Sequence, residues 1–173
     1  MPLEDVGLPE SSLVQRDIVA RATYVEAYRV RLTNPQASVT ELFFAVFGHR
    51  PVWMKALFIA RNVLVRPLGL AVPPVAQILS NARRERYCDG DTILSWPIFA
   101  LTETELVAGR NNAHLDFRFS ILKEQHGDGV DGVFSTICAA HHWGGRLYLK
   151  AILPFHRPGF RWLLRRAILT GRL

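Results

Sequence analysis

Cysteine is scarce in this sequence, and no metal-binding pattern is present. Only two of the 173 residues are cysteine, Cys88 and Cys138, which is too few for the disulfide framework of a small secreted protein. The sequence also lacks a zinc-finger spacing, a Gly-x-Ser-x-Gly elbow and a P-loop. We therefore expect reduced thiols, no resident metal ion and no bound cofactor.

The chain also lacks a hydrophobic run long enough to span a membrane. Its longest uncharged stretch, residues 67–82, is interrupted by Pro73 and Pro74, whereas a spanning helix needs about 20 apolar residues. The N-terminal segment carries Glu4 and Asp5 instead of the basic-then-apolar pattern of a signal peptide. We expect a soluble, cytoplasmic protein.

Acidic residues are outnumbered by basic ones, 15 against 21, which gives a net charge of +6. Such an excess is compatible with a nucleic acid, an anionic membrane or an acidic protein as partner. The basic residues concentrate in residues 146–166 and in a group formed by Arg83, Arg84 and Arg86. Because no arginine-rich tail or nucleic-acid motif occurs, we favour a solvated helix face and expect no nucleic-acid partner.

The clearest structural pattern is the strict alternation of polar and apolar residues over 113–121. A period of two is typical of a half-buried β-strand. One face carries Leu115, Phe117, Phe119 and Ile121, and the other carries His114, Asp116, Arg118 and Ser120. The first face therefore must meet an apolar interior, and the second meets water or a site.

Other local patterns predict one strand and two helices before this point. Alternation over residues 24–32 indicates a strand. Ser38 and Glu41 have the spacing of a capping box, and the helix that they begin should end at Gly48 in a left-handed conformation. A second helix over residues 52–66 is apolar around most of its circumference, so it should be buried.

The remainder of the chain reads as strands joined by short turns, followed by a long helix. Strands linked in this way are antiparallel neighbours. Pro154 and Pro158 should kink or divide the helix. The expected segments are strands 92–101, 104–108, 113–121 and 133–143, turns 109–112 and 126–129, a loop over 70–82, and a helix over 146–173.

This order of elements predicts an α+β helix-grip fold, in which a curved antiparallel sheet wraps the last helix and two short helices follow the first strand. An antiparallel sheet has one apolar face to cover, and the terminal helix is the element long enough to cover it. We expect residues 1–18 to form an irregular arm and residues 19–173 to form a single domain.

Three segments, residues 61–70, residues 114–118 and residues 145–156, resemble a bacterial family known as domain of unknown function 2867. That family is similar in layout to the START and Bet v 1 (SRPBCC) group of helix-grip proteins. The resemblance implies a hydrophobic cavity for lipids or other apolar ligands. Some relatives look fused to an NAD(P)-binding Rossmann domain, which this chain is too short to hold, so the resemblance allows a separate NAD(P)-dependent reductase as partner.

Aromatic residues from the strands and the terminal helix should face one another. They form either a packed core or the wall of a ligand cavity, and the resemblance favours the cavity. The expected ligand-binding residues are Trp96, Phe99, Phe117, Phe119, Phe134, Tyr148 and Phe155.

His114 and Asp116 are the first candidates for chemistry, because a histidine held by a carboxylate is a usable general base. Simple pairing through turn 109–112 would place Glu103 and Glu105 opposite Arg118 and Asp116. The favoured interpretation is then a charged ladder on the solvent side of the sheet, with cross-strand ion pairs of about 0.2–1 kcal/mol.

His141 and His142 are the second candidates. Adjacent strand residues point to opposite faces, so one of the two should face the interior as a polar handle or proton carrier, although a buried, hydrogen-bonded histidine is the simpler reading. A metal site of His114, Asp116 and His142 matches no known zinc pattern and is disfavoured. His156 should satisfy a carbonyl freed at the helix kink.

Three functions from different classes follow. The leading hypothesis is a binding protein for an apolar or amphipathic small molecule, held between the sheet and the terminal helix. The second is an enzyme, cyclase- or hydrolase-like, that uses an inward His141 or His142. The third is a peripheral membrane protein whose basic terminal helix lies on anionic lipid. We favour binding over catalysis and assign no catalytic residue.

Overall fold

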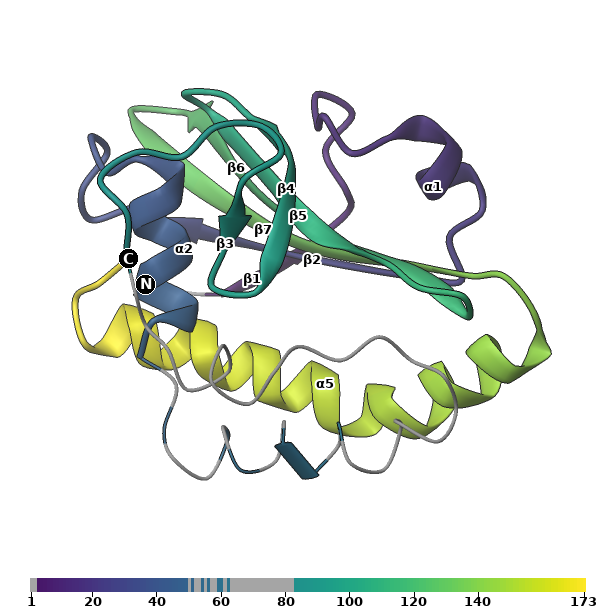
Figure 1. Ribbon diagram of the computed structural model, residues 1–173. Helices are drawn as coiled ribbons and strands as arrows, with labels where there is room; N and C mark the ends of the chain where they lie inside the picture. Colours follow the sequence, from purple (N-terminus) through teal and green to yellow (C-terminus); the bar gives the residue numbers. More distant parts are fainter. Residues whose placement is uncertain are drawn as a thin grey trace.

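The computed structural model describes residues 3–49, the single residues 51, 54, 56, 59, 60 and 62, and residues 83–173. Figure 1 shows their arrangement, with a sheet on one side of the molecule and a long helix crossing beneath it. Most of the helix expected over 52–66, the loop expected over 70–82 and the family-like segment 61–70 lie outside the described residues.

Within the described part of the chain, seven antiparallel strands form one curved, unclosed sheet with the order β1-β2-β7-β6-β5-β4-β3. The strands are β1 (Glu4–Val6), β2 (Tyr24–Arg31), β3 (Thr92–Ile93), β4 (Trp96–Leu101), β5 (Glu105–Asn111), β6 (Leu115–His126) and β7 (Gly129–Ala140). The described helices are α1 (Arg16–Ala20), α2 (Val39–Phe47) and α5 (Trp143–Leu169). The α+β class and the antiparallel sheet with a C-terminal helix are therefore as predicted.

The inner face of the sheet meets α2 and α5 in the main hydrophobic core. Phe119 and Ile121 of β6 are fully buried there, which confirms the apolar face predicted for this strand. From the helices, Phe47 stands 4.9 Å from Phe119 between ring centroids, and Phe160 stands 5.6 Å from it. The core thus joins the middle of the sheet to both helices.

Helix α2 begins as the sequence predicts. The Ser38 hydroxyl accepts a hydrogen bond from the Glu41 amide at 3.2 Å, and the Glu41 carboxylate accepts one from the Ser38 amide at 2.9 Å. Its end differs from the prediction, because Gly48 has a right-handed conformation with φ −69°. Glycine is needed here for space, since a Cβ atom would lie 2.6 Å from the Phe44 carbonyl oxygen.

Helix α5 starts three residues earlier than predicted and is continuous. His142 caps it, its Nδ1 accepting a hydrogen bond from the Gly144 amide at 3.1 Å. Pro154 and Pro158 lie inside the helix, and Figure 1 shows α5 bending along its length instead of dividing. A bend is the expected response to prolines that remove backbone donors from a helix.

Several strand boundaries also differ from the prediction. Strand β6 continues to His126, and the strand expected over 133–143 begins at Gly129 and ends at Ala140. The strand expected over 92–101 turns back on itself at Leu94, which has φ 53°, so β3 and β4 form a hairpin. Gly109 and Arg110, expected in a turn, are paired within β5. At Gly109 the requirement is close approach, because a Cβ atom would come within 2.0 Å of the Phe117 carbonyl oxygen.

The outer face of the sheet is covered by the N-terminal segment, which was expected to be an irregular arm. Strand β1 pairs with β2, and the residues up to α1 cross the sheet (Figure 1). Val14 and Ile18 pack there against Val107, Ile137 and Ala139 in a second hydrophobic cluster. Residues on this face that were expected to meet solvent are therefore buried.

Replacing Ile18 by alanine should destabilise the protein by about 2–4 kcal/mol, because Ile18 is only 3% exposed and its removal leaves a cavity. Urea unfolding followed by circular dichroism measures the change. Leu13→Ala is the control, since Leu13 is 47% exposed in the same segment and should change stability by about 0.5 kcal/mol or less. Equal effects of the two substitutions would mean that the segment does not cover the sheet as described.

Candidate functional site

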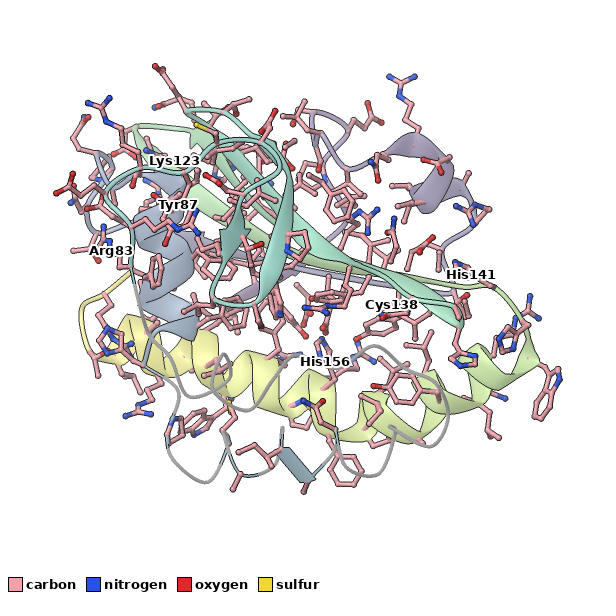
Figure 2. The ribbon with its side chains drawn as sticks, viewed as in Figure 1. Arg83, Tyr87, Lys123, Cys138, His141 and His156 are labelled. Carbon is pink, nitrogen blue, oxygen red and sulfur yellow. The ribbon has the colours of Figure 1, made fainter. Side chains whose placement is uncertain are left out.

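A buried polar cluster lies between the inner face of the sheet and the middle of α5. Its centre is Glu26 of β2, which is 6% exposed. The Glu26 carboxylate lies 2.8 Å from Nε2 of His156 and accepts a hydrogen bond from the Tyr28 hydroxyl at 3.0 Å. It also interacts with the hydroxyl of Tyr24. Figure 2 shows His156 pointing from α5 into this space, with Cys138 of β7 nearby.

The alternation of β2 places these groups together. Tyr24, Glu26 and Tyr28 share the face of β2 that looks toward α5, where Tyr28 is fully buried in the core. From α5 the site receives His156, which lies between Pro154 and Pro158. A carboxylate and two tyrosine hydroxyls therefore meet one imidazole in an otherwise apolar interior.

The first half of α5 is less closely packed than the second half. Leu149 and Phe160 are buried, but none of the residues 150–159 between them is. At Gly159 an added Cβ atom would meet nothing within 4 Å. The imidazole of His156 is 31% exposed, whereas its Nε2 atom, Oε1 of Glu26 and the Tyr24 hydroxyl are shielded from solvent. One edge of the ring therefore faces solvent and the other faces the buried carboxylate.

The charge state of Glu26 is set by two opposing effects. Burial opposes ionisation, but the close contact with His156 and the nearby tyrosine hydroxyls outweigh it and lower the pKa of Glu26. Burial and the nearby Glu26 carboxylate raise the pKa of Tyr24 well above its ordinary value, and they raise that of Tyr28 in the same way. At neutral pH the cluster therefore contains one carboxylate and two neutral phenols.

Apolar residues surround this cluster on the side of β6 and β7. Leu115, Cys138 and Leu149 form a buried group, against which Tyr24, Phe117, Tyr148 and Leu153 pack. Burial raises the pKa of the Cys138 thiol to about 12. The thiol is thus neutral at physiological pH and acts as a small apolar side chain, which agrees with its expected reduced state.

This arrangement can orient a polar group and exchange a proton with it. The imidazole is held by a carboxylate, and the phenols supply donors, while the surroundings suit an apolar body. Glu26 was not singled out from the sequence, and His156 was expected to bind a backbone carbonyl. Glu26 could have been found from the alternation of β2, because that pattern places it on the same face as Tyr24 and Tyr28.

The histidines predicted from the sequence lie elsewhere, where β6 begins, β7 ends and α5 starts. Figure 2 shows His141 at this end of the sheet. His141 Nε2 is 3.0 Å from the Asp116 carboxylate, so Asp116 pairs with His141 and not with His114. His114 Nδ1 is instead 2.8 Å from His142 Nε2. Neither His141 nor His142 points into the interior, because both residues follow the last paired residue of β7 and no longer alternate across the sheet.

These histidines do not combine into a metal site with Asp116. His142 Nδ1 accepts a hydrogen bond from the backbone of α5, so its Nε2 carries the proton that faces His114. No group of three histidine, cysteine or acidic side chains in the described chain could hold a metal ion.

Residues 127–132 have the spacing GxGxxG, but the structure places them in the β6–β7 hairpin and not before a helix, so they form no dinucleotide motif.

The predicted charged ladder on the outer face is instead a buried polar network. Glu105 pairs in register with Leu122 and not with Asp116. Its carboxylate accepts hydrogen bonds from Ser12 and Ser120 and from the Leu13 amide at 2.5–2.6 Å. Arg118, only 2% exposed, donates to Gln15 and lies 3.6 Å above the Phe99 ring. These groups fasten the N-terminal segment to the sheet.

The aromatic residues expected to bind a ligand occupy three environments. Trp96, Phe117 and Phe119 pack edge to face in the core, with Trp96 centroids 5.3 Å from Phe117 and 5.8 Å from Phe119, and Phe134 is fully buried. Tyr148 packs against the apolar group of Leu115, Cys138 and Leu149. Two of the residues do not face the interior as expected. Phe99 lies on the outer face beside Arg118, and Phe155 is 69% exposed.

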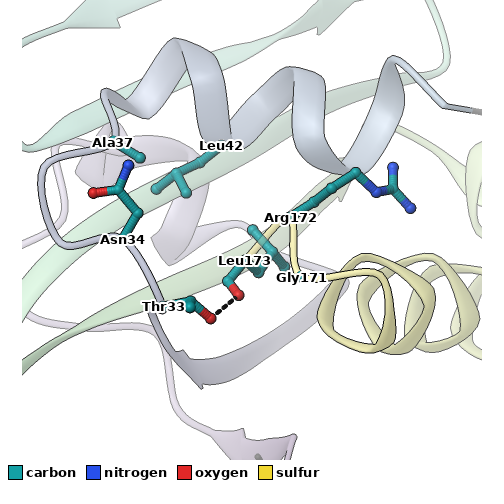
Figure 3. Close-up of a pocket in the computed structure, with 7 residues that line it drawn as sticks. All are labelled: Thr33, Asn34, Ala37, Leu42, Gly171, Arg172 and Leu173. Carbon is teal, nitrogen blue, oxygen red and sulfur yellow. Dashed lines mark hydrogen bonds between the residues drawn. The ribbon is translucent and has the colours of Figure 1, made fainter.

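A small hollow lies at a different place, where the C-terminal residues meet the loop before α2 (Figure 3). Its volume is about 70 Å³, and the Thr33 hydroxyl donates a hydrogen bond to the backbone oxygen of Leu173 at its edge. Ligand pockets usually measure about 300–1,000 Å³. The hollow is therefore suited to ordered water, and not to a ligand of ordinary size.

Comparison with known proteins places the chain in a family. A family model described as protein of unknown function (DUF2867) matches residues 18–162. The chain belongs to this family. Neither the search of curated proteins nor the search of solved structures found a match. The matched region contains both Glu26 and His156, whose activity the family description leaves open.

No described helix has the length and apolar character to cross a bilayer.

Glu26→Gln should destabilise the protein by about 1–3 kcal/mol at neutral pH, because it removes the charge that pairs with His156 inside the molecule. The loss should shrink in acid. The folded-state pKa of Glu26 lies below its ordinary value of 4.5, so its contribution is present above that pH and disappears as pH falls through the folded-state pKa. Urea unfolding from pH 7 to pH 3 (roughly the range of carboxyl titration) measures the difference.

Glu103→Gln is the matched control, because Glu103 is exposed in the turn between β4 and β5. Its pH dependence should parallel that of the unmodified protein. If Glu26→Gln and Glu103→Gln gave the same pH dependence, the buried carboxylate would not be ionised as described.

Proposed function

We propose that this protein is a helix-grip protein that binds an amphipathic small molecule between the inner face of its sheet and the first half of α5. The observation that carries the proposal is the Glu26–His156 contact of 2.8 Å in an apolar interior. Burying a carboxylate is costly, and buried ionisable groups with a shifted pKa cluster at ligand-binding and catalytic sites.

The surroundings support an amphipathic ligand in preference to a polar one. Leu115, Leu149 and Leu153 offer an apolar wall, and the phenol of Tyr24 lies beside the carboxylate. A ligand with an apolar body and one hydroxyl, carbonyl or amine group would satisfy both regions. The loose packing around the prolines of α5 supports entry here, because none of residues 150–159 is buried.

A second candidate function is proton-transfer catalysis at the same place. A histidine oriented by a carboxylate is the usual arrangement of a general base. In this alternative His156, and not His141 or His142, would exchange a proton with the bound molecule while Glu26 stabilised the imidazolium. The two functions differ in what happens to the ligand, which a binding protein releases unchanged and an enzyme converts.

Nile red, a neutral apolar dye, should bind the protein with a rise in its fluorescence, because its rings can lie against the apolar wall beside Glu26. Leu153→Gln should weaken this binding by about tenfold or more, since it places an amide in that wall. The matched control is Leu13→Gln, because Leu13 is exposed in the N-terminal segment and the substitution should leave dye binding unchanged.

Failure of Nile red to bind, or equal binding of the dye by Leu153→Gln and Leu13→Gln, would contradict the proposed site. Native mass spectrometry of the freshly purified protein then separates the two candidate functions. A bound mass that stays constant indicates a binding protein. A bound mass that changes with time in the unmodified protein, but not in His156→Gln, indicates an enzyme.

A further inference from the structure

The face of α5 that points away from the sheet carries a stripe of exposed apolar side chains. Five of the seven large hydrophobic residues that are exposed in the described part of the chain belong to this one helix. With 3.6 residues per turn they fall on a single side, opposite the buried Leu149, Phe160 and Leu164. The stripe consists of Trp143, Leu147, Phe155, Trp162 and Leu169, which are 79%, 59%, 69%, 39% and 86% exposed.

Phe155 was expected from the sequence to face the interior as a ligand-binding residue. The structure turns Phe155 outward together with Leu147, because the positions that contact the sheet are those of Leu149, Phe160 and Leu164. Large apolar side chains exposed in a run along one helix mark an interaction surface. Among the residues that the structure describes, nothing covers Trp143, Leu147, Phe155 or Leu169, which are each more than half exposed. These four side chains therefore need an occupant.

The charges beside the stripe define that occupant. The chain has no acidic residue after Asp131, and α5 carries Arg146, Lys150, Arg157, Arg161, Arg165 and Arg166. Arg146, Lys150 and Arg165 are exposed beside the apolar side chains. An exposed helix with aromatic and aliphatic residues on one side, flanked by cations and free of anions, matches the interface of an anionic bilayer.

We infer that α5 docks in the plane of an anionic lipid membrane through this stripe. Trp143, Leu147 and Phe155 enter the boundary between head groups and acyl chains, while the flanking cations contact lipid phosphates. Trp162, whose ring lies 5.3 Å from the Arg166 guanidinium, sits at the same level, where tryptophan is favoured. The sheet faces away from the membrane. This docking does not depend on the interior ligand site.

The test is co-sedimentation of the full chain with vesicles of phosphatidylcholine that contain about one-third phosphatidylglycerol, a composition rich enough in charge to attract basic segments. We expect binding to these vesicles, weaker binding at high salt, and none to pure phosphatidylcholine. The emission of Trp143 and Trp162 should shift to the blue on binding, and Trp143→Phe with Trp162→Phe should remove that shift.

Two sets of substitutions separate this surface from general charge attraction. Arg146→Gln, Lys150→Gln and Arg165→Gln together should weaken vesicle binding by about tenfold or more. The control triple Arg83→Gln, Arg84→Gln and Arg86→Gln has the same charge change away from α5 and should weaken it far less. Leu147→Gln, Phe155→Gln and Leu169→Gln should also weaken binding about tenfold, unlike Leu13→Gln.

The inference is overturned if the anionic vesicles sediment no more protein than pure phosphatidylcholine does. It is also overturned if the control triple reduces binding as much as the α5 triple, which would mean nonspecific charge attraction. Concentration-dependent dimerisation that Leu147→Gln, Phe155→Gln and Leu169→Gln abolish would assign the stripe to a second copy of the chain instead. Loss of vesicle binding would leave the interaction of Nile red with the interior unaffected.

Discussion

The packing of the second half of α5 on the inner face of the sheet is the constraint on which the other features depend. Phe160, Leu163 and Leu164 of α5 are buried there against β2 and β6, and full burial of such side chains contributes about 1.5–3 kcal/mol each. This contact fixes the rotation of the helix. Once the rotation is fixed, His156 must point toward Glu26, and Trp143 and Phe155 must point away from the sheet.

The same helix therefore has two sides with different roles. Its inner side closes the core tightly near the C-terminal end and loosely around Pro154 and Pro158, where the buried carboxylate lies. Its outer side exposes apolar and basic groups together. A binding site for an amphipathic molecule and a membrane-facing surface on one helix are physically compatible, since both would handle molecules that partition into lipid.

The sheet is covered on both faces. This differs from the usual case, because regular alternation such as that of β6 is typical of a strand with one face in solvent. The N-terminal segment supplies Ser12 and Gln15, whose side chains meet Glu105 and Arg118. Buried charges of this kind are stable only when their hydrogen bonds are satisfied. The outer face thus acts as a rigid support, which leaves the inner face to hold the candidate site.

Features that depend on neighbouring residues could be predicted from the sequence. The alternation in β2 and β6 and the capping box of Ser38 and Glu41 are of this kind, because period and spacing determine them locally. The contact of His156 with Glu26 could not be predicted, since it joins residues far apart in the chain and depends on the rotation of α5. The burial of Arg118 was missed for a similar reason, because the segment that covers it has only a weak pattern of its own.

The most direct test of this account is a double-mutant cycle between sheet and helix, with Glu26→Gln, His156→Gln and the combined variant compared by urea unfolding at neutral pH. The Glu26–His156 contact of 2.8 Å predicts a coupling free energy of about 1 kcal/mol or more. The two substitutions would then destabilise less together than their separate effects add up to. Strict additivity would contradict the account, because it would mean that α5 does not bring His156 to the buried carboxylate.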